Sequence, residues 1–99
     1  LEIDLVRIFR RDPRIARYRI KVTEQEVGYG KNRYGAFAWL SKWGEKGGCV
    51  IARQYIRKPG QSIDEVKIRI DARSCSSEQK QPSRVSFLLG LMERLEIQD

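Results

Sequence analysis

The clearest secondary-structure signal in the chain is the segment EVKIRIDAR at residues 65–73. Its apolar side chains, those of Val66, Ile68, Ile70 and Ala72, alternate with charged ones. Alternation with a period of two residues is typical of a strand that buries one face and exposes the other to solvent. The segment therefore predicts a strand of an antiparallel sheet with a charged outward face. That face carries Lys67, Arg69, Asp71 and Arg73.

Three earlier segments also predict strands. Residues 17–23 alternate apolar with basic side chains, residues 34–43 are apolar over most of their length, and residues 49–57 alternate again. Stretches that contain glycine favour turns, because glycine adopts backbone conformations that other residues avoid. Such stretches occur at residues 28–33, 44–48 and 58–61. The pattern predicts strands joined in sequence as a meander, with a hairpin at residues 44–48.

The last part of the chain predicts a polar loop followed by a helix. Pro82 suits the first turn of a helix, because the N–H that proline lacks would be unpaired there. Apolar residues then recur at helical spacing. They are Val85, Leu88, Leu89, Met92 and Leu95, and Phe87 and Leu91 widen the apolar face. We expect this helix to pack across one face of the sheet.

The N-terminal segment fits two patterns. Leu1, Ile3 and Leu5 alternate as in a strand, whereas Leu1, Leu5, Ile8 and Phe9 fit the stripe of an amphipathic helix. We predict a strand that breaks before the proline at position 13, because the residue before proline avoids the helical region. A helix remains the alternative.

Together these elements predict an α+β fold, an antiparallel meander sheet of about four to five strands with a C-terminal helix packed across one face. The chain has 99 residues and is 40% hydrophobic, which suits a single domain with its own core. It begins with Leu1, which leaves open that it is a segment of a longer protein. The predicted parts are a basic N-terminal segment (1–16), the sheet (17–73), a loop (74–81) and the helix (82–97).

The charge of the chain is large and unevenly distributed. Lys and Arg number 20 against 13 Asp and Glu, a formal net charge of +7. Residues 7–21 contain seven basic residues and one acidic residue, whereas residues 76–99 carry a net charge of −1. A concentrated positive charge favours a polyanionic partner. The absence of histidine excludes catalytic triads, proton shuttles and zinc sites that need imidazole.

The two cysteines lack the close spacing of a metal site or a redox motif. Cys49 opens an apolar strand and is expected to be buried, whereas Cys75 is expected to be an exposed thiol in the loop. A disulfide between them is a possibility that the spacing does not support. No run approaches the roughly 18 apolar residues of a membrane-spanning helix. We therefore expect a soluble intracellular protein, cytoplasmic or nuclear, with no membrane partner.

The leading hypothesis is a nucleic-acid-binding domain, with RNA slightly favoured over DNA. The preference for RNA follows from basic sheet faces with interleaved aromatic residues and from the lack of an arginine-rich recognition helix. Arginine suits this role because its planar fork makes paired hydrogen bonds to phosphate. The predicted binding residues are Arg7, Arg10, Arg11, Arg14, Arg17, Arg19, Lys31, Arg33, Trp43, Arg53, Tyr55, Lys67, Arg69 and Arg73.

Two other functions compete with this one. The wide apolar face of the C-terminal helix predicts a protein-interaction module that forms a homodimer. Glu65-Val66-Lys67 resembles half of the PD-(D/E)xK nuclease motif, and Glu45 or Asp64 would have to complete a Mg²⁺ site. Short acid-x-Lys matches arise often by chance, so we expect neither an enzyme nor a bound metal or other cofactor.

Overall fold

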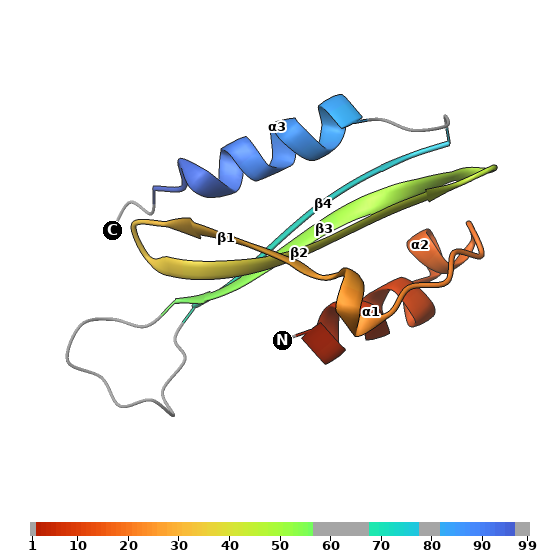
Figure 1. Cartoon of the computed structure of the whole chain (residues 1–99), viewed down its shortest axis with the longest axis horizontal. Coiled ribbons are helices and arrows are strands. Elements are labelled where there is room, and N and C mark those ends of the chain that lie inside the picture. The colour runs from red at the N-terminus through yellow and green to blue at the C-terminus, as the bar shows by residue number, and fades with distance from the viewer. Residues whose placement is uncertain (1, 57–67, 78–81, 97–99) are drawn as a thin grey trace.

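The computed structural model describes residues 2–56, 68–77 and 82–96 as two helical layers on a four-stranded sheet. The strands pair antiparallel in the order β1-β2-β3-β4, with α3 on one face and α1 and α2 on the other (Figure 1). This arrangement confirms the predicted α+β meander. The elements are α1 (Glu2–Arg11), α2 (Pro13–Ala16), the 3-10 helix η1 (Glu24–Glu26), β1 (Gly28–Asn32), β2 (Gly35–Gly44), β3 (Gly47–Ile56), β4 (Ile68–Ser76) and α3 (Pro82–Glu93).

The central strand β3 is buried on both faces. Cys49 and Ile51 point into the core under α1, and Val50 and Ala52 point into a second core under α3. Each large apolar side chain so buried contributes roughly 1.5–3 kcal/mol of transfer free energy. The sheet is therefore held by two cores, and the helices that cover it decide which parts of its faces reach solvent.

Residues 2–11 form a helix, so the predicted N-terminal strand is wrong and the helical alternative is correct. Leu5, Val6 and Phe9 are buried against the sheet. Acidic residues lie in the first turn and basic residues in the last, which suits the helix dipole. Helix α1 ends before Asp12. The side chain of Asp12 accepts a hydrogen bond of 2.9 Å from the backbone N–H of Arg14 and so caps the N-terminus of α2.

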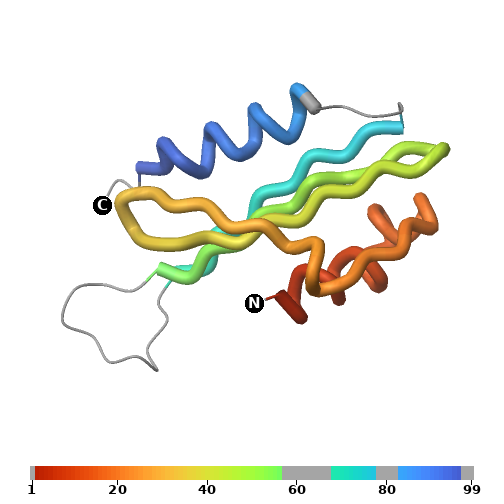
Figure 2. Tube along the Cα trace, viewed as in Figure 1, coloured from red at the N-terminus to blue at the C-terminus, as the bar shows by residue number. Residues whose placement is uncertain are grey.

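The predicted strand at residues 17–23 is also wrong. The segment carries the chain from α2 back toward β1 without pairing as a strand (Figure 2). Arg19 has φ +54°, a left-handed conformation that cannot continue a strand. Val22 is still buried, and Tyr18 and Ile20 pack against the core. The alternation therefore predicted which side chains turn inward but not the pairing.

The glycines of residues 28–33 make room for neighbouring side chains and do not form the predicted turn. Residues 28–32 form strand β1 instead, and the turn lies at Arg33 and Tyr34. A Cβ on Gly30 would lie 2.3 Å from the ring of Phe37, and one on Gly28 would lie 2.6 Å from the ring of Trp39. Only glycine leaves room for these two rings on the neighbouring strand.

The strands at residues 34–43 and 49–57 and the hairpin between them are confirmed as β2 and β3. Strand β4 extends through Ser74, Cys75 and Ser76, which were predicted as loop. Cys75 is not a free thiol, because it forms a disulfide with Cys49, the residue opposite it on β3. Helix α3 begins at Pro82 as predicted but ends at Glu93. The turn at 58–61 and the start of the predicted strand at 65–67 lie outside the described residues.

Candidate nucleic-acid interface

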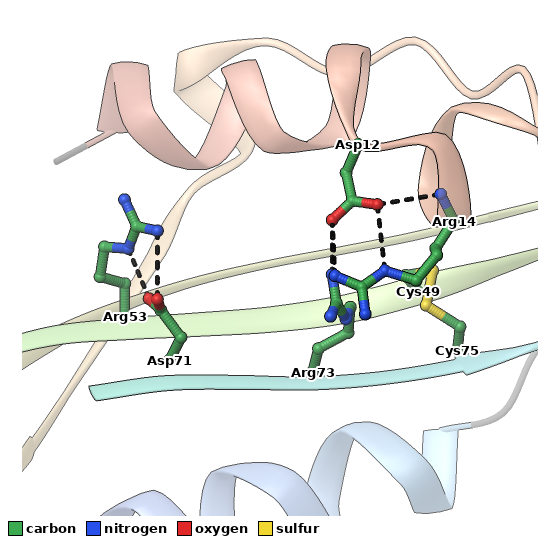
Figure 3. Close-up of polar contacts among 7 residues, drawn as sticks. All are labelled: Asp12, Arg14, Cys49, Arg53, Asp71, Arg73 and Cys75. Carbon is green, nitrogen blue, oxygen red and sulfur yellow. Dashed lines mark hydrogen bonds and ion pairs between the residues drawn. A yellow bond between two sulfur atoms is a disulfide. The ribbon is translucent and has the colours of Figure 1, made fainter. Parts of the chain in front are cut away.

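The predicted binding residues divide into those that are ion-paired within the protein and those that are not. The most enclosed is Arg53 on β3, whose side chain is 11% exposed. Its Nε lies 2.6 Å from Oδ1 of Asp71 on β4, and its Nη2 lies 3.3 Å from Oδ2 (Figure 3). Burial favours the neutral form of Arg53, but the hydrogen bond and charge of Asp71 outweigh it and raise the pKa of the guanidinium. Arg53 therefore forms an ion pair that joins β3 to β4, and it would have to leave this pair to bind a phosphate.

A second ion-paired group joins α2 to the edge of the sheet. Asp12 accepts hydrogen bonds from Arg14 through Oδ1 and from Arg73 of β4 through Oδ2, the latter at 2.5 Å (Figure 3). The hydrogen bonds from Arg14, with the charges of Arg14 and Arg73, hold the pKa of Asp12 below its ordinary value. Two predicted phosphate-binding arginines thus share one carboxylate.

Other predicted residues also have partners inside the protein. Arg69 lies 3.0 Å from Asp71, and Arg33 lies 3.0 Å from Glu96. Tyr55 donates its hydroxyl hydrogen bond to Asp4 of α1 at 3.1 Å. Its contact with nucleic acid stays a prediction, as does that of the arginines. Lys67 lies outside the described residues.

The remaining predicted cations have no carboxylate partner among the described residues. Arg7, Arg10 and Arg11 lie on the exposed side of α1. Arg17 stacks on the ring of Tyr18, with 4.9 Å between its Cζ and the ring centroid. The others in this group are Arg19 and Lys31, both exposed.

Arg19 lines a hollow beside the β2–β3 hairpin, which we call the hairpin hollow. Residues 18–21 form one wall, residues 42–46 form the other, and the volume between them is about 450 Å³. The walls approach closely, since a Cβ on Gly44 would lie 3.6 Å from Cγ1 of Ile20. Four cations line the hollow, against one carboxylate, that of Glu45. The cations are Arg19, Lys21, Lys42 and Lys46.

Trp43 also lines the hairpin hollow and is half-buried. Its Nε1 is buried and has no hydrogen-bond partner among the described residues. Lys42 is partly neutralised by Glu26, and the hydrogen bond from Lys42 holds the pKa of Glu26 below its ordinary value. The ring of Trp43 also packs against the core under α3, so only part of it is open to a ligand. The hollow therefore combines a surplus of positive charge, which suits a phosphate, with a half-buried aromatic side chain.

The structure adds three cations that are not among the predicted binding residues. Lys42 and Lys46 flank Trp43 in the sequence, so their position beside it could have been predicted. Lys21 belongs to the basic N-terminal stretch, but only the path of residues 18–21 along the hairpin brings it to the hollow. Tertiary folding thus joins two basic segments that are 20 residues apart in the chain.

No known protein family, curated protein or solved structure matches the chain. Within the described ranges, no group of three or more metal-ligating side chains could hold a metal ion. No helix in the part of the chain that the structure describes could cross a membrane.

Proposed function

We propose that this protein is a nucleic-acid-binding domain that acts by binding and not by catalysis. The observation that carries the proposal is the hairpin hollow, which four cations from two segments line together with Trp43. Cations from distant segments repel one another, and a phosphate backbone bound between them would relieve that repulsion. Trp43 would stack on a base next to the bound phosphates.

The exposed side of α1 supplies further positive charge to the same proposal. Arg7, Arg10 and Arg11 have no ion-pair partner among the described residues, so they bind phosphate without breaking an internal contact. The ion-paired arginines of β3 and β4 would each first have to leave a carboxylate. We therefore assign phosphate binding to α1 and the hairpin hollow in preference to the ion-paired arginines of the sheet.

One of the two grounds for favouring RNA was the lack of an arginine-rich recognition helix, and α1 carries Arg7, Arg10 and Arg11. The other ground, basic sheet faces with interleaved aromatic residues, is unchanged, so the preference for RNA stays a prediction. The experiment therefore includes RNA and DNA, each single-stranded and double-stranded.

The test is a salt titration of binding, with variants matched in charge. Arg19→Gln/Lys21→Gln removes two cations from the hollow, and Arg33→Gln/Arg69→Gln removes two ion-paired cations from elsewhere. On duplex DNA the first variant should reduce the slope of log K against log salt by about 1.8, since each phosphate contact contributes about 0.9. The control should change the slope by less than half as much. Equal effects of the two variants, or binding that salt does not weaken, would refute the proposal.

Fluorescence tests the stacking role of Trp43 separately. Trp39→Phe leaves Trp43 as the sole tryptophan of the chain. Binding of a single-stranded oligonucleotide should quench its emission, because a stacked base contacts the indole ring. Unchanged emission at saturation would remove Trp43 from the interface and leave the phosphate contacts standing.

A homodimer through α3 is a second candidate function, favoured by one observation. Phe87 is 66% exposed and Leu91 is 47% exposed, one helical turn apart on the side of α3 away from the sheet. Two large apolar side chains together on a surface favour a protein partner. A dimer would also double the basic surface that is offered to nucleic acid.

Two earlier expectations remain part of the proposal. Glu65 and Lys67 of the nuclease-like motif lie outside the described residues, so the absence of nuclease activity is tested by incubating labelled duplex with Mg²⁺.

An intracellular location suits a nucleic-acid partner, but the Cys49–Cys75 disulfide favours an oxidising compartment. Thiol alkylation in a cell extract, without reductant, tests the location.

A further inference from the structure

A cavity of about 380 Å³ lies between α1 and the strands β3 and β4, away from the hairpin hollow. Half of its ten lining residues are charged, and its apolar lining residues include Leu5 and Ile8 of α1 and Ile51 of β3, of which Leu5 and Ile51 are buried. This volume falls within the range of small-molecule sites, and the charged lining favours an ionic ligand. We call it the α1–β4 cavity.

The polar groups of the α1–β4 cavity are unequally balanced at its two ends. At one end Arg53 is matched by Asp71 in a two-point contact. At the other end both Arg14 and Arg73 line the cavity and share the single carboxylate of Asp12. At the first end two cations, Arg53 and Arg69, face two carboxylates, those of Asp71 and Asp4. The second end carries a surplus of one positive charge.

The shared carboxylate has no free oxygen to offer a second partner. Oδ1 of Asp12 accepts from the N–H and Nε of Arg14, and Oδ2 accepts from Arg73 and from Nη2 of Arg14. Arg73 uses one Nη in this contact, and a guanidinium has five N–H donors. Neither arginine has another carboxylate partner among the described residues. One further anion would complete this end of the cavity.

We propose that the α1–β4 cavity binds a small amphipathic carboxylate, with its anionic group on Arg73 and Arg14 and its hydrocarbon body against Ile8, a half-buried apolar side chain at the cavity. One surplus charge matches a monoanion, and the fork of an arginine matches a carboxylate. This site is separate from the exposed side of α1 and from the hairpin hollow, to which phosphate binding is assigned first.

The probe for this proposal is 4-phenylbutanoate, followed by NMR of the methyl groups of Leu5, Ile8 and Ile51. Saturable shifts of these methyl signals are expected. The neutral amide of the same acid keeps the hydrocarbon body and loses the charge, so it should bind at least tenfold more weakly. Butanoate keeps the charge and loses the ring, and it should bind more weakly as well.

Two variants on strand β4 distinguish binding at the cavity from a nonspecific effect of the protein's positive charge. Arg73→Gln should weaken binding of 4-phenylbutanoate roughly tenfold, the loss of one charged contact. Arg69→Gln removes an equal charge from the same face of β4 but does not line the cavity, so binding should stay within about twofold of the wild type. Ile8→Phe fills the cavity without touching the arginines and should abolish binding, which keeps the test valid if Arg73→Gln unfolds.

Three results would overturn the proposal. They are the absence of saturable methyl shifts at millimolar probe, equal binding of the acid and its amide, and equal losses in Arg73→Gln and Arg69→Gln. Each leaves the nucleic-acid proposal untouched, because the titration variants of the hairpin hollow do not involve this cavity.

Discussion

Reduction of the Cys49–Cys75 disulfide should cost this protein a large part of its stability. The bond closes a sequence separation of 26 residues, for which the chain-entropy relation gives about 3.5 kcal/mol at 25 °C. A domain of this size has a free energy of unfolding of about 5–15 kcal/mol. Opening the bond therefore removes between a quarter and more than half of that free energy.

The assay is urea denaturation followed by circular dichroism, with and without reductant. The reduced protein should unfold at a lower urea midpoint, and its m-value should rise because its unfolded state is less compact. Cys49→Ala/Cys75→Ala should match the reduced protein within about 1 kcal/mol and should not respond to reductant.

Two results would refute this reasoning. One is an unchanged urea midpoint when both thiols are shown by mass to be reduced. The other is alkylation of both cysteines in the folded protein before any reductant is added, since a disulfide leaves no thiol to react.

Three further predictions concern the strands, the ion pairs and α3. Gly30→Ala should destabilise the fold by about 1–3 kcal/mol in urea denaturation, because its Cβ would meet the ring of Phe37; a stabilised variant would contradict the packing role of this glycine. The pKa of Asp12 is held below its ordinary value of 3.8, so its contribution to stability is complete above that pH and is lost as pH falls through the lowered pKa. Asp12→Asn should therefore lose stability at neutral pH and show a smaller further loss in acid; parallel pH profiles would exclude the ion pairs as the cause. Phe87→Ser/Leu91→Ser should abolish any dimer seen by light scattering with little loss of monomer stability, because both side chains are exposed, whereas an unchanged mass would exclude this face of α3.

The sequence predicted the elements whose signals are local. Strands β2, β3 and β4 follow from apolar runs and alternation, the hairpin from its glycines, and the start of α3 from Pro82. The site was less predictable. The arginines at 53, 69 and 73 looked like a solvated basic face, but a carboxylate lies within reach of each. Whether a cation is paired depends on side chains that meet only after folding.

What the sequence determined by itself was the fold class, because the periods of strands and helices are properties of neighbouring residues. Tertiary structure decided the rest, in places where two local patterns fit equally or where distant residues had to meet. Residues 2–11 are a helix because the sheet needs a cover over Leu40 and Ile51, and an amphipathic helix supplies Leu5 and Phe9. In the same way, the disulfide and the hairpin hollow each join segments that lie 20 or more positions apart, a proximity that no local pattern encodes.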